Sequence, residues 1–328
     1  NEISVDAAKK LWPKAKFDDV IAAFYTPEDG RANPVDLTMS LARGAKMGGA
    51  KIIEGVSVTG IKQKNGKVVG VNTEHGDIDS TYVVNCAGMW ARQFGEMAGV
   101  SLPLQAAEHY YLITDDMEGM HRDLPILEDP DSFAYYREEV GSLMIGLFEP
   151  VAKAWNLDHI PENFVFGEID PDWDRMVPFL EKAYERVPDA AELGIRKFFC
   201  GPESFTPDLA PLVGETSELK NFFVACGLNS LGILSAGGIG RLLAQWIVDG
   251  RPDLDVTGIN VNRFHPCQRN PKYRYDRIVE VLGKMYESHY PNLGMSSARN
   301  MKQSVLHERL KAAGAYFVES AGWELVDW

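Results

Sequence analysis

The sequence predicts a mixed α/β fold in which a strand-rich segment interrupts an α/β domain. Two apolar runs, at 81–90 and 226–240, each end in small residues and lead into a helical pattern. Between them, short strand-like runs are separated by acidic or Gly-rich turns, which is typical of an antiparallel sheet. We expect a leading segment at 1–34, an α/β domain formed by 35–100 and 200–254, an antiparallel domain at 101–199 and a C-terminal module at 255–328.

The first α/β stretch should begin with two helices. Ser4 can cap a short helix over 5–11, which Pro13 ends. Apolar residues at a four-residue spacing predict a second helix over 35–47, closed by two glycines. An Asn-Gly turn should then join two strands. We expect those strands over 52–61 and 67–72, a third strand over 81–85, and a helix over 90–98.

The later elements follow from the same patterns. Apolar residues on one face predict a helix over 171–187, and an apolar stripe predicts another over 233–248. The remaining predictions are strands at 109–114, 133–137 and 143–148 in the antiparallel domain, strands at 195–199 and 222–226 that return the chain to the first domain, and helices around 275–286 and 304–313.

Composition narrows the classes of partner. The 328-residue chain has 47 acidic and 33 basic residues, which argues against a nucleic-acid or anionic-membrane surface because both need basic patches. Small molecules or other proteins are therefore the expected partners. The four cysteines form no C-x-x-C pair, which indicates reduced thiols in a bacterial cytoplasm or a mitochondrial matrix. No apolar run of about eighteen residues appears, so no membrane span is expected.

Both ends of the sequence have the character of cut sites. The N-terminal stretch NEISVDAAKKLWP has no initiator Met and no apolar signal-peptide core. The C-terminal stretch GWELVDW is rich in aromatic residues and has no polar tail. We therefore expect the chain to be the interior of a longer protein.

The small-residue turn before the helix over 233–248 is a candidate binding site. A helix that begins there points unpaired N–H groups outward, which suits an anionic group such as a phosphate. A tight packing corner between strand and helix is an equally acceptable interpretation of the pattern. The run from Gly238 to Leu243 lacks the third glycine of G-x-G-x-x-G, so it is no dinucleotide fingerprint. The histidines have no metal-ligand spacing, and no G-x-S-x-G elbow is present.

A few side chains in the antiparallel domain are candidates for chemistry. His109 lies at the start of a predicted strand, where its ring can face either the core or a cleft. Tyr135 and Tyr136 must alternate faces, so one can pack in the core while the other lines a cleft. Arg31 and Arg137 can clamp a substrate carboxylate, although a solvated surface position explains them equally well.

Several long stretches stand out along almost the entire chain, in order: Asp29-Gly30 with Asn33-Pro34, VVNCAGMWA, EHYYLIT, FAYYRE, CGPESFTPD, PLVGE, CGLNSLGI with AGGIG, DGRP, NRFH and AGWE. Together they resemble the sarcosine dehydrogenase and dimethylglycine dehydrogenase family of FAD-dependent demethylating enzymes. The CGPESFTPD stretch is more similar to sarcosine dehydrogenase than to the dimethylglycine enzyme.

The resemblance implies a fold and a cofactor. It implies a partial glutathione-reductase-type FAD-binding domain, an antiparallel-sheet substrate domain and a C-terminal linker module. The first βαβ unit, with its phosphate fingerprint and the histidine that carries a covalent flavin link in family members, is expected before Asn1. A folate-binding domain commonly follows the AGWE region, so tetrahydrofolate is a possible second ligand of the parent protein. By resemblance, the cofactor-binding residues are Val58, Ala87, Gly88, Trp90, Gly201, Leu231, Gly232, Ile233 and Leu234.

The resemblance also implies a reaction and its residues. His109 and Tyr135 match the active-site His and Tyr of the family, and metal ligands are not expected. The implied activity is the oxidation of sarcosine or a related N-methyl amino acid by hydride transfer to flavin, with an acceptor such as an electron-transfer flavoprotein. Two alternatives stay open. One is a demethylase for dimethylglycine or another methylamine or betaine, and the other is a non-catalytic homologue resembling the regulatory subunit of pyruvate dehydrogenase phosphatase. The isolated chain is expected to be inactive.

Overall fold

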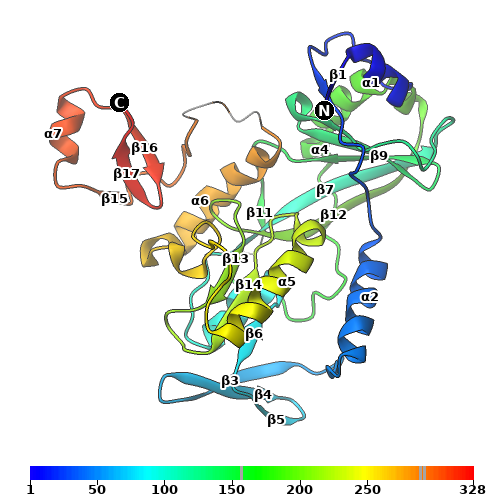
Figure 1. Cartoon of the computed structure of the whole chain (residues 1–328). Coiled ribbons are helices and arrows are strands. Elements are labelled where there is room, and N and C mark those ends of the chain that lie inside the picture. The colour runs from blue at the N-terminus through cyan, green and yellow to red at the C-terminus, as the bar shows by residue number, and fades with distance from the viewer. Residues whose placement is uncertain (156–157, 288–289, 291–292) are drawn as a thin grey trace.

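An antiparallel sheet dominates the computed structural model, which describes residues 1–155, 158–287, 290 and 293–328 (Figure 1). The strand order is β11-β7-β10-β9-β8, and β12 also pairs with β7. Because side chains alternate along a strand, His109 and Tyr111 lie on one face and Tyr110 and Leu112 on the other. We call these the inner and outer faces. The strands are β7 (Gln105–Asp116), β8 (Leu127–Asp129), β9 (Ala134–Glu139), β10 (Ser142–Leu147), β11 (Ala154–Trp155) and β12 (Ile195–Phe205).

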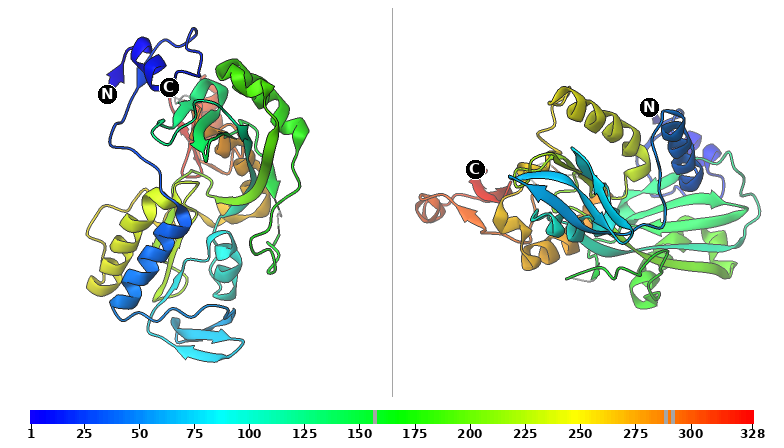
Figure 2. Two further views of the ribbon diagram at one scale, coloured as in Figure 1. Left: turned by 90° about the vertical axis from the view of Figure 1, so that its right-hand side faces the viewer. Right: turned by 90° about the horizontal axis from the view of Figure 1, so that it is seen from below.

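Helices cover the outer face of this sheet. Helix α4 (Trp173–Arg186) lies along it, and α1 (Val5–Leu11) packs beside it at the N-terminal end of the chain (Figure 2). The core between them contains Trp12 and Met176, together with the fully buried Tyr136 of β9. The 3₁₀ turns η2 (Pro130–Ser132) and η3 (Pro188–Glu192) and the short pair β1 (Glu2–Ile3) and β2 (Ala23–Phe24) lie in the connections.

The α/β part is built around a three-stranded sheet of order β13-β14-β6. Helix α5 (Gly232–Asp249) packs on one side of it, through a core that includes Phe223 and Leu242. The other side carries η1 (Gly88–Trp90) and α3 (Ala91–Met97), and α2 (Pro34–Met47) has no buried side chain. The strands are β6 (Val83–Asn85), β13 (Leu212–Glu215) and β14 (Phe222–Cys226), with a separate meander of β3 (Val58–Lys64), β4 (Lys67–Thr73) and β5 (Gly76–Asp79).

The C-terminal module packs against the inner face of the main sheet. Ile278 and Leu282 contact the cluster formed by Ala107, Phe148 and Phe205. The module then ends in a small sheet of order β15-β17-β16 (Figure 1). Its elements are η4 (Val261–Arg263), η5 (Pro266–Arg269), α6 (Pro271–Val281), η6 (Leu282–Met285), β15 (Lys302–Gln303), α7 (His307–Ala312), β16 (Phe317–Ser320) and β17 (Trp323–Val326).

Most of the predicted elements are present, with three informative differences. The strand expected over 52–61 begins only at Val58, because residues 52–57 pair with no strand. Strand β5 was not predicted, since its four residues are all exposed and show no apolar alternation. Strand β12 was expected to end at 199 but continues to Phe205, through a Gly-Pro pair that suggested a loop. The antiparallel sheet thus crosses the domain boundary predicted after residue 199.

Candidate active site

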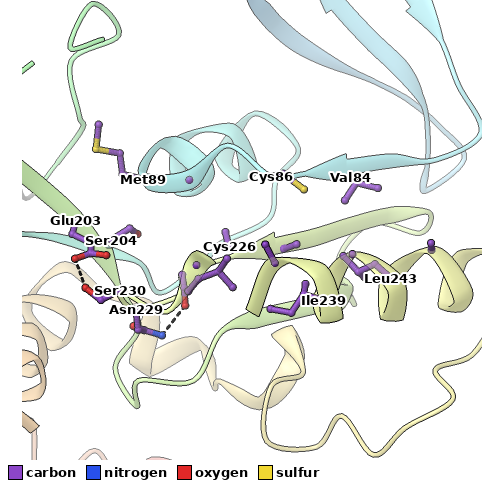
Figure 3. A pocket seen from close by; sticks show the side chains of 18 of the residues that line it. Val84, Cys86, Met89, Glu203, Ser204, Cys226, Asn229, Ser230, Ile239 and Leu243 are labelled. Atoms are coloured by element: carbon purple, nitrogen blue, oxygen red, sulfur yellow. Dashed lines mark hydrogen bonds between the residues drawn. The ribbon is translucent and has the colours of Figure 1, made fainter. Parts of the chain in front are cut away.

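A pocket of about 700 Å³ lies between β6, the end of β12 and the connection from β14 to α5 (Figure 3). Small and apolar residues form most of its wall, among them Gly88, Gly232 and Ile239. The polar side chains that line it include Glu203 and Ser230, which are joined by a hydrogen bond of 2.5 Å from the serine hydroxyl to the carboxylate. A carboxylate therefore faces a pocket that is otherwise weakly polar.

The connection from β14 to α5 is held in an unusual backbone conformation. Gly227, Asn229 and Ser230 all have positive φ angles, of 64°, 49° and 64°. Residues other than glycine rarely adopt this region, so other contacts must stabilise the loop. Buried Asn229 provides them, because its side-chain oxygen accepts from the Thr206 amide at 2.8 Å. Its Nδ2 also donates to the Gly227 carbonyl at 2.6 Å (Figure 3).

The same loop delivers the N-terminus of α5 to the pocket. Leu231 is the N-cap residue and no side chain caps the helix. The first-turn amides therefore remain available, and the helix dipole adds positive character at this end. A pocket of this size, with small wall residues and free helix amides, fits a flavin ring whose carbonyl edge needs hydrogen-bond donors.

His109 and Tyr135 meet around one phenylalanine on the inner face of the sheet. The His109 ring centroid lies 4.6 Å from that of Phe148, and the Tyr135 centroid lies 6.2 Å from it. Tyr286, which follows η6, stacks on Phe148 at 4.5 Å and so closes one side of the group. The two side chains that the resemblance assigns to catalysis therefore both lie against the same phenylalanine.

Tyr135 lies across the neighbouring strand because Gly146 has no side chain. A Cβ at Gly146 would be 1.9 Å from Cζ of Tyr135 and 2.2 Å from its hydroxyl oxygen. In the strand register, Gly146 is paired with Tyr135 on one side and with Tyr111 on the other. The tyrosine hydroxyl is thus directed from β9 toward β7, the strand that carries His109.

Burial sets the protonation states of this pair. It lowers the pKa of His109, while the negative charge of Glu203 acts in the opposite direction. Burial also raises the pKa of Tyr135 to about 12, so its hydroxyl stays protonated near neutral pH. The buried Nδ1 of His109 has no hydrogen-bond partner within the described part of the chain. Burial therefore favours a neutral His109 ring and a protonated Tyr135 hydroxyl, the states in which a histidine can act as a base and a tyrosine as a hydrogen-bond donor.

The cofactor-binding residues predicted by resemblance fall into separate places. Gly88 and Gly232 line the pocket, and Gly201 pairs with His109 in the strand register. Val58 opens the separate β3-β4-β5 meander and does not line the pocket. The remaining positions are Ala87 beside Gly88, Trp90, whose indole donates to the Pro161 carbonyl at 3.2 Å, and the exposed Leu231, Ile233 and Leu234 at the start of α5.

Arg31 and Arg137, the two candidates for binding a substrate carboxylate, have different partners and positions. Arg31 donates to both the backbone and the side chain of Glu138, with a 2.6 Å ion pair, so it ties the N-terminal segment to the sheet. Arg137 lies on the inner face two residues from Tyr135 and pairs with Glu139 at 2.7 Å. Of the two, Arg137 alone shares a face with the candidate catalytic pair.

Several site residues were missed from the sequence. Phe148 and Tyr286 come from segments far apart in the chain, and no local pattern joins them. The available signal for Glu203 was the two-residue period of β12, which places it on the same face as Gly201. That signal was lost because the strand was expected to end at residue 199.

Comparison with known proteins identifies the family. Residues 2–246 match the family model described as FAD dependent oxidoreductase, and residues 249–304 match the FAD dependent oxidoreductase central domain. The chain therefore belongs to the FAD-dependent oxidoreductase family. The fold agrees, since it is similar to L-proline dehydrogenase from P. horikoshii with a TM-score of 0.70 and 26% identity, over 80% of this chain and 68% of that one.

Within this family the chain is most informatively compared with N-methyl amine enzymes. It is 40% identical to 4-methylaminobutanoate oxidase (formaldehyde-forming) of Paenarthrobacter nicotinovorans and 39% identical to mitochondrial sarcosine dehydrogenase of Homo sapiens, each over 99% of its length. The mitochondrial pyruvate dehydrogenase phosphatase regulatory subunit of Mus musculus is 33% identical. These matches confirm the resemblance seen in the sequence. The chain spans only 39%, 36% and 37% of these proteins, respectively.

The described residues offer neither a metal-ligand cluster nor a membrane-spanning helix. Throughout the described residues, no group of three His, Cys, Asp or Glu side chains is placed to hold a metal ion. Nor does any helix in those same ranges combine the length and apolar character needed to cross a membrane.

Proposed function

We propose that this chain is part of an FAD-dependent enzyme that oxidises sarcosine or a related N-methyl amino acid at its N-methyl group. One observation carries the proposal, the pairing of His109 and Tyr135 around Phe148 on the inner face of the sheet. The relatives named for their action on N-methyl amines support the substrate class, among them 4-methylaminobutanoate oxidase, sarcosine dehydrogenase and dimethylglycine dehydrogenase. Because the chain spans less than half of those proteins, the activity belongs to the longer parent protein.

The residues of this chain would bind the cofactor and the amine in neighbouring positions. We assign the flavin ring to the pocket beside Gly88, Gly201 and the first turn of α5, and the adenine to Val58. When bound, FAD supplies the acceptor for the hydride of the N-methyl group. The residues of this chain act instead on the proton carried by the amine. A protonated amine must lose that proton before oxidation. We propose that neutral His109 takes it and that the Tyr135 hydroxyl, which keeps its own proton, orients the nitrogen.

The wider proposal follows the resemblance. The parent protein would pass its electrons to an acceptor such as an electron-transfer flavoprotein, and a folate-binding domain would collect the released carbon on tetrahydrofolate. A bacterial cytoplasm or a mitochondrial matrix is the proposed location. The competing proposal is a regulatory subunit, for which the 33% identity to the phosphatase subunit is the supporting observation.

The deciding experiment adds sarcosine, dimethylglycine and 4-methylaminobutanoate anaerobically to the full-length parent protein and follows the flavin absorption spectrum. Rapid bleaching by one of them is expected and would name the substrate. A flavin that stays oxidised with all three would contradict the proposal and favour the regulatory function.

The His109→Ala variant tests the role of the histidine in the same assay. We expect the rate of flavin reduction to fall by about 10² to 10⁴, the usual contribution of a placed general base. Asp253→Asn is the matched control, since Asp253 pairs with Arg241 at the exposed side of α5. An unchanged rate in the His109→Ala protein would remove His109 from the mechanism.

A further inference from the structure

Glu203 lies close to His109 on the inner face of the sheet. In the pairing of β12 with β7, Gly201 is opposite His109 and Glu203 is opposite Ala107. Diagonal neighbours in such a pair are about 7–8 Å apart at Cα, which is within reach of long side chains. Gly201 has no side chain of its own, and the ring of Phe199 lies over it, with Cζ 2.7 Å from where a Cβ would be. The diagonal register is therefore what places Glu203 near His109.

The carboxylate of Glu203 is also held in a fixed place. The Ser230 hydroxyl donates to it at 2.5 Å, as the dashed line in Figure 3 shows. Ser230 belongs to the loop whose positive φ angles are maintained by buried Asn229. An ordinary surface glutamate is solvated and free to move. Glu203 instead is hydrogen-bonded to the anchored loop and faces the pocket.

Few other polar groups face His109. Tyr135 of β9 and Tyr286 after η6 approach it through Phe148, and both phenols keep their protons because burial raises their pKa. Glu128 of β8 is connected to this group through its hydrogen bond to Tyr286. Strand β10 contributes Gly146, which has no charge. Arg137 of β9 shares the face but pairs with Glu139, so among the described side chains Glu203 is the charged group that acts on the protonation of His109.

We propose that Glu203 is a positioning residue for proton transfer, whose carboxylate stabilises the imidazolium of His109 after that ring has accepted the proton of the substrate amine. The N–H bond of the ammonium breaks, an N–H bond forms on the imidazole, and Glu203 keeps its own protonation state throughout. The free amine is left ready for oxidation. This inference deepens the proposed function and rests on it for the identity of the proton donor.

The test uses the Glu203→Gln variant of the full-length holoenzyme, which keeps the shape of the side chain and an oxygen for Ser230. The rate of flavin reduction by the amine is measured against pH. Removing the charge makes the imidazolium less stable, so the acidic limb of the profile is expected to move to lower pH. The maximal rate of flavin reduction should fall by about tenfold, because His109 remains in place but its imidazolium is no longer stabilised by the charge of Glu203. The Asp253→Asn control should leave the pH of the acidic limb and the maximal rate unchanged.

A second readout does not depend on the amine. Diethylpyrocarbonate reacts with neutral imidazole, so the rate of His109 modification, followed by peptide mass spectrometry across pH, reports the protonation of this ring. The midpoint should move to lower pH in Glu203→Gln and by a smaller amount in Ser230→Ala, where the carboxylate is present but untethered. Glu203→Asp keeps the charge at a greater distance and should also give a smaller shift. It replaces the glutamine variant if that protein does not fold.

The outcomes separate the two proposals. If no amine bleaches the flavin, the proposed function fails, while the His109 midpoint still decides the part played by Glu203. An unchanged midpoint in Glu203→Gln overturns the inference, whatever happens to the rate. A shift in the flavin reduction potential with an unchanged midpoint would overturn it in favour of a direct effect on the flavin.

Discussion

At the scale of single residues, the placement of Tyr135 depends on what Gly146 lacks. The phenol ring occupies the space above β10 that a side chain would fill, with its hydroxyl only 2.2 Å from the position of a Cβ at Gly146. Interiors tolerate such overlap poorly, so either the ring or the strand must move when a methyl group is added. The position of Tyr135 in the candidate catalytic pair therefore depends on the absence of a side chain at Gly146.

The Gly146→Ala substitution should displace Tyr135 and leave the flavin pocket intact. We expect the rate of flavin reduction by the amine to fall by at least about tenfold, since misplacement by about 1 Å can cost up to 10²-fold. Stopped-flow reduction of the holoenzyme measures this. Gly258→Ala is the matched control, because a Cβ there meets nothing within 4 Å. Equal rates in the two variants would show that the position of Tyr135 is unimportant.

Buried Glu149 should make stability depend on pH. It pairs with Arg175 at 2.8 Å, yet burial raises its pKa to about 7. The folded protein therefore holds a proton that the unfolded chain releases near pH 4.5. The stability contributed by this group is full below that pH and is lost as the pH rises through about 7.

The expected result is a melting temperature that falls from pH 5 to pH 7.5, and that falls less in Glu149→Gln. Calorimetry at both pH values checks it. Glu218→Gln is a suitable control, because the carboxyl of Glu218 has a pKa below its usual range, held down by Arg269 against the opposing effect of burial. An identical pH dependence in wild type and Glu149→Gln would contradict the assignment.

At the scale of elements, the connection from β14 to α5 combines strain with strong anchoring. Asn229 makes two of the hydrogen bonds that hold it, to Thr206 and to Gly227. Asn229→Ala should cost about 2 kcal/mol of unfolding free energy, because a buried amide loses its partner. Asn229→Gly loses the same bonds but tolerates the φ of 49° without strain. Urea unfolding should therefore place the glycine variant between alanine and wild type, and full recovery by glycine would show that the hydrogen bonds contribute little.

Local pattern explains which elements were predictable. The bounds of α1 and β14 were predicted correctly because a cap residue, a proline and an uninterrupted apolar run mark them. The site was only half predictable. His109 and Tyr135 follow from family-like stretches, whereas Phe148 and Tyr286 contact each other only through packing of the C-terminal module on the sheet. Glu203 was hidden because Gly201 and Pro202 interrupt the pattern of β12.

At the scale of the whole molecule, the α/β part has, within the described residues, a sheet edge that pairs with no further strand and a helix that buries no side chain. The sheet that borders the pocket has three strands with β6 at its edge, and α2 buries none of its side chains. The sequence also contains no Gly-rich phosphate fingerprint. Expressed as these 328 residues alone, the chain is expected not to retain flavin through gel filtration, whereas the longer parent protein proposed above should. Stoichiometric flavin absorbance in the purified chain would contradict this.

Strand β12 is shared by both halves of the site. Near its middle, Gly201 pairs with the strand that carries His109, and immediately after its end Thr206 is bonded to the loop before α5. The strand that faces His109 and the anchor of the loop before α5 are therefore parts of one continuous segment, so a substitution that bends β12 near Gly201 is expected to disturb both sides of the candidate site at once.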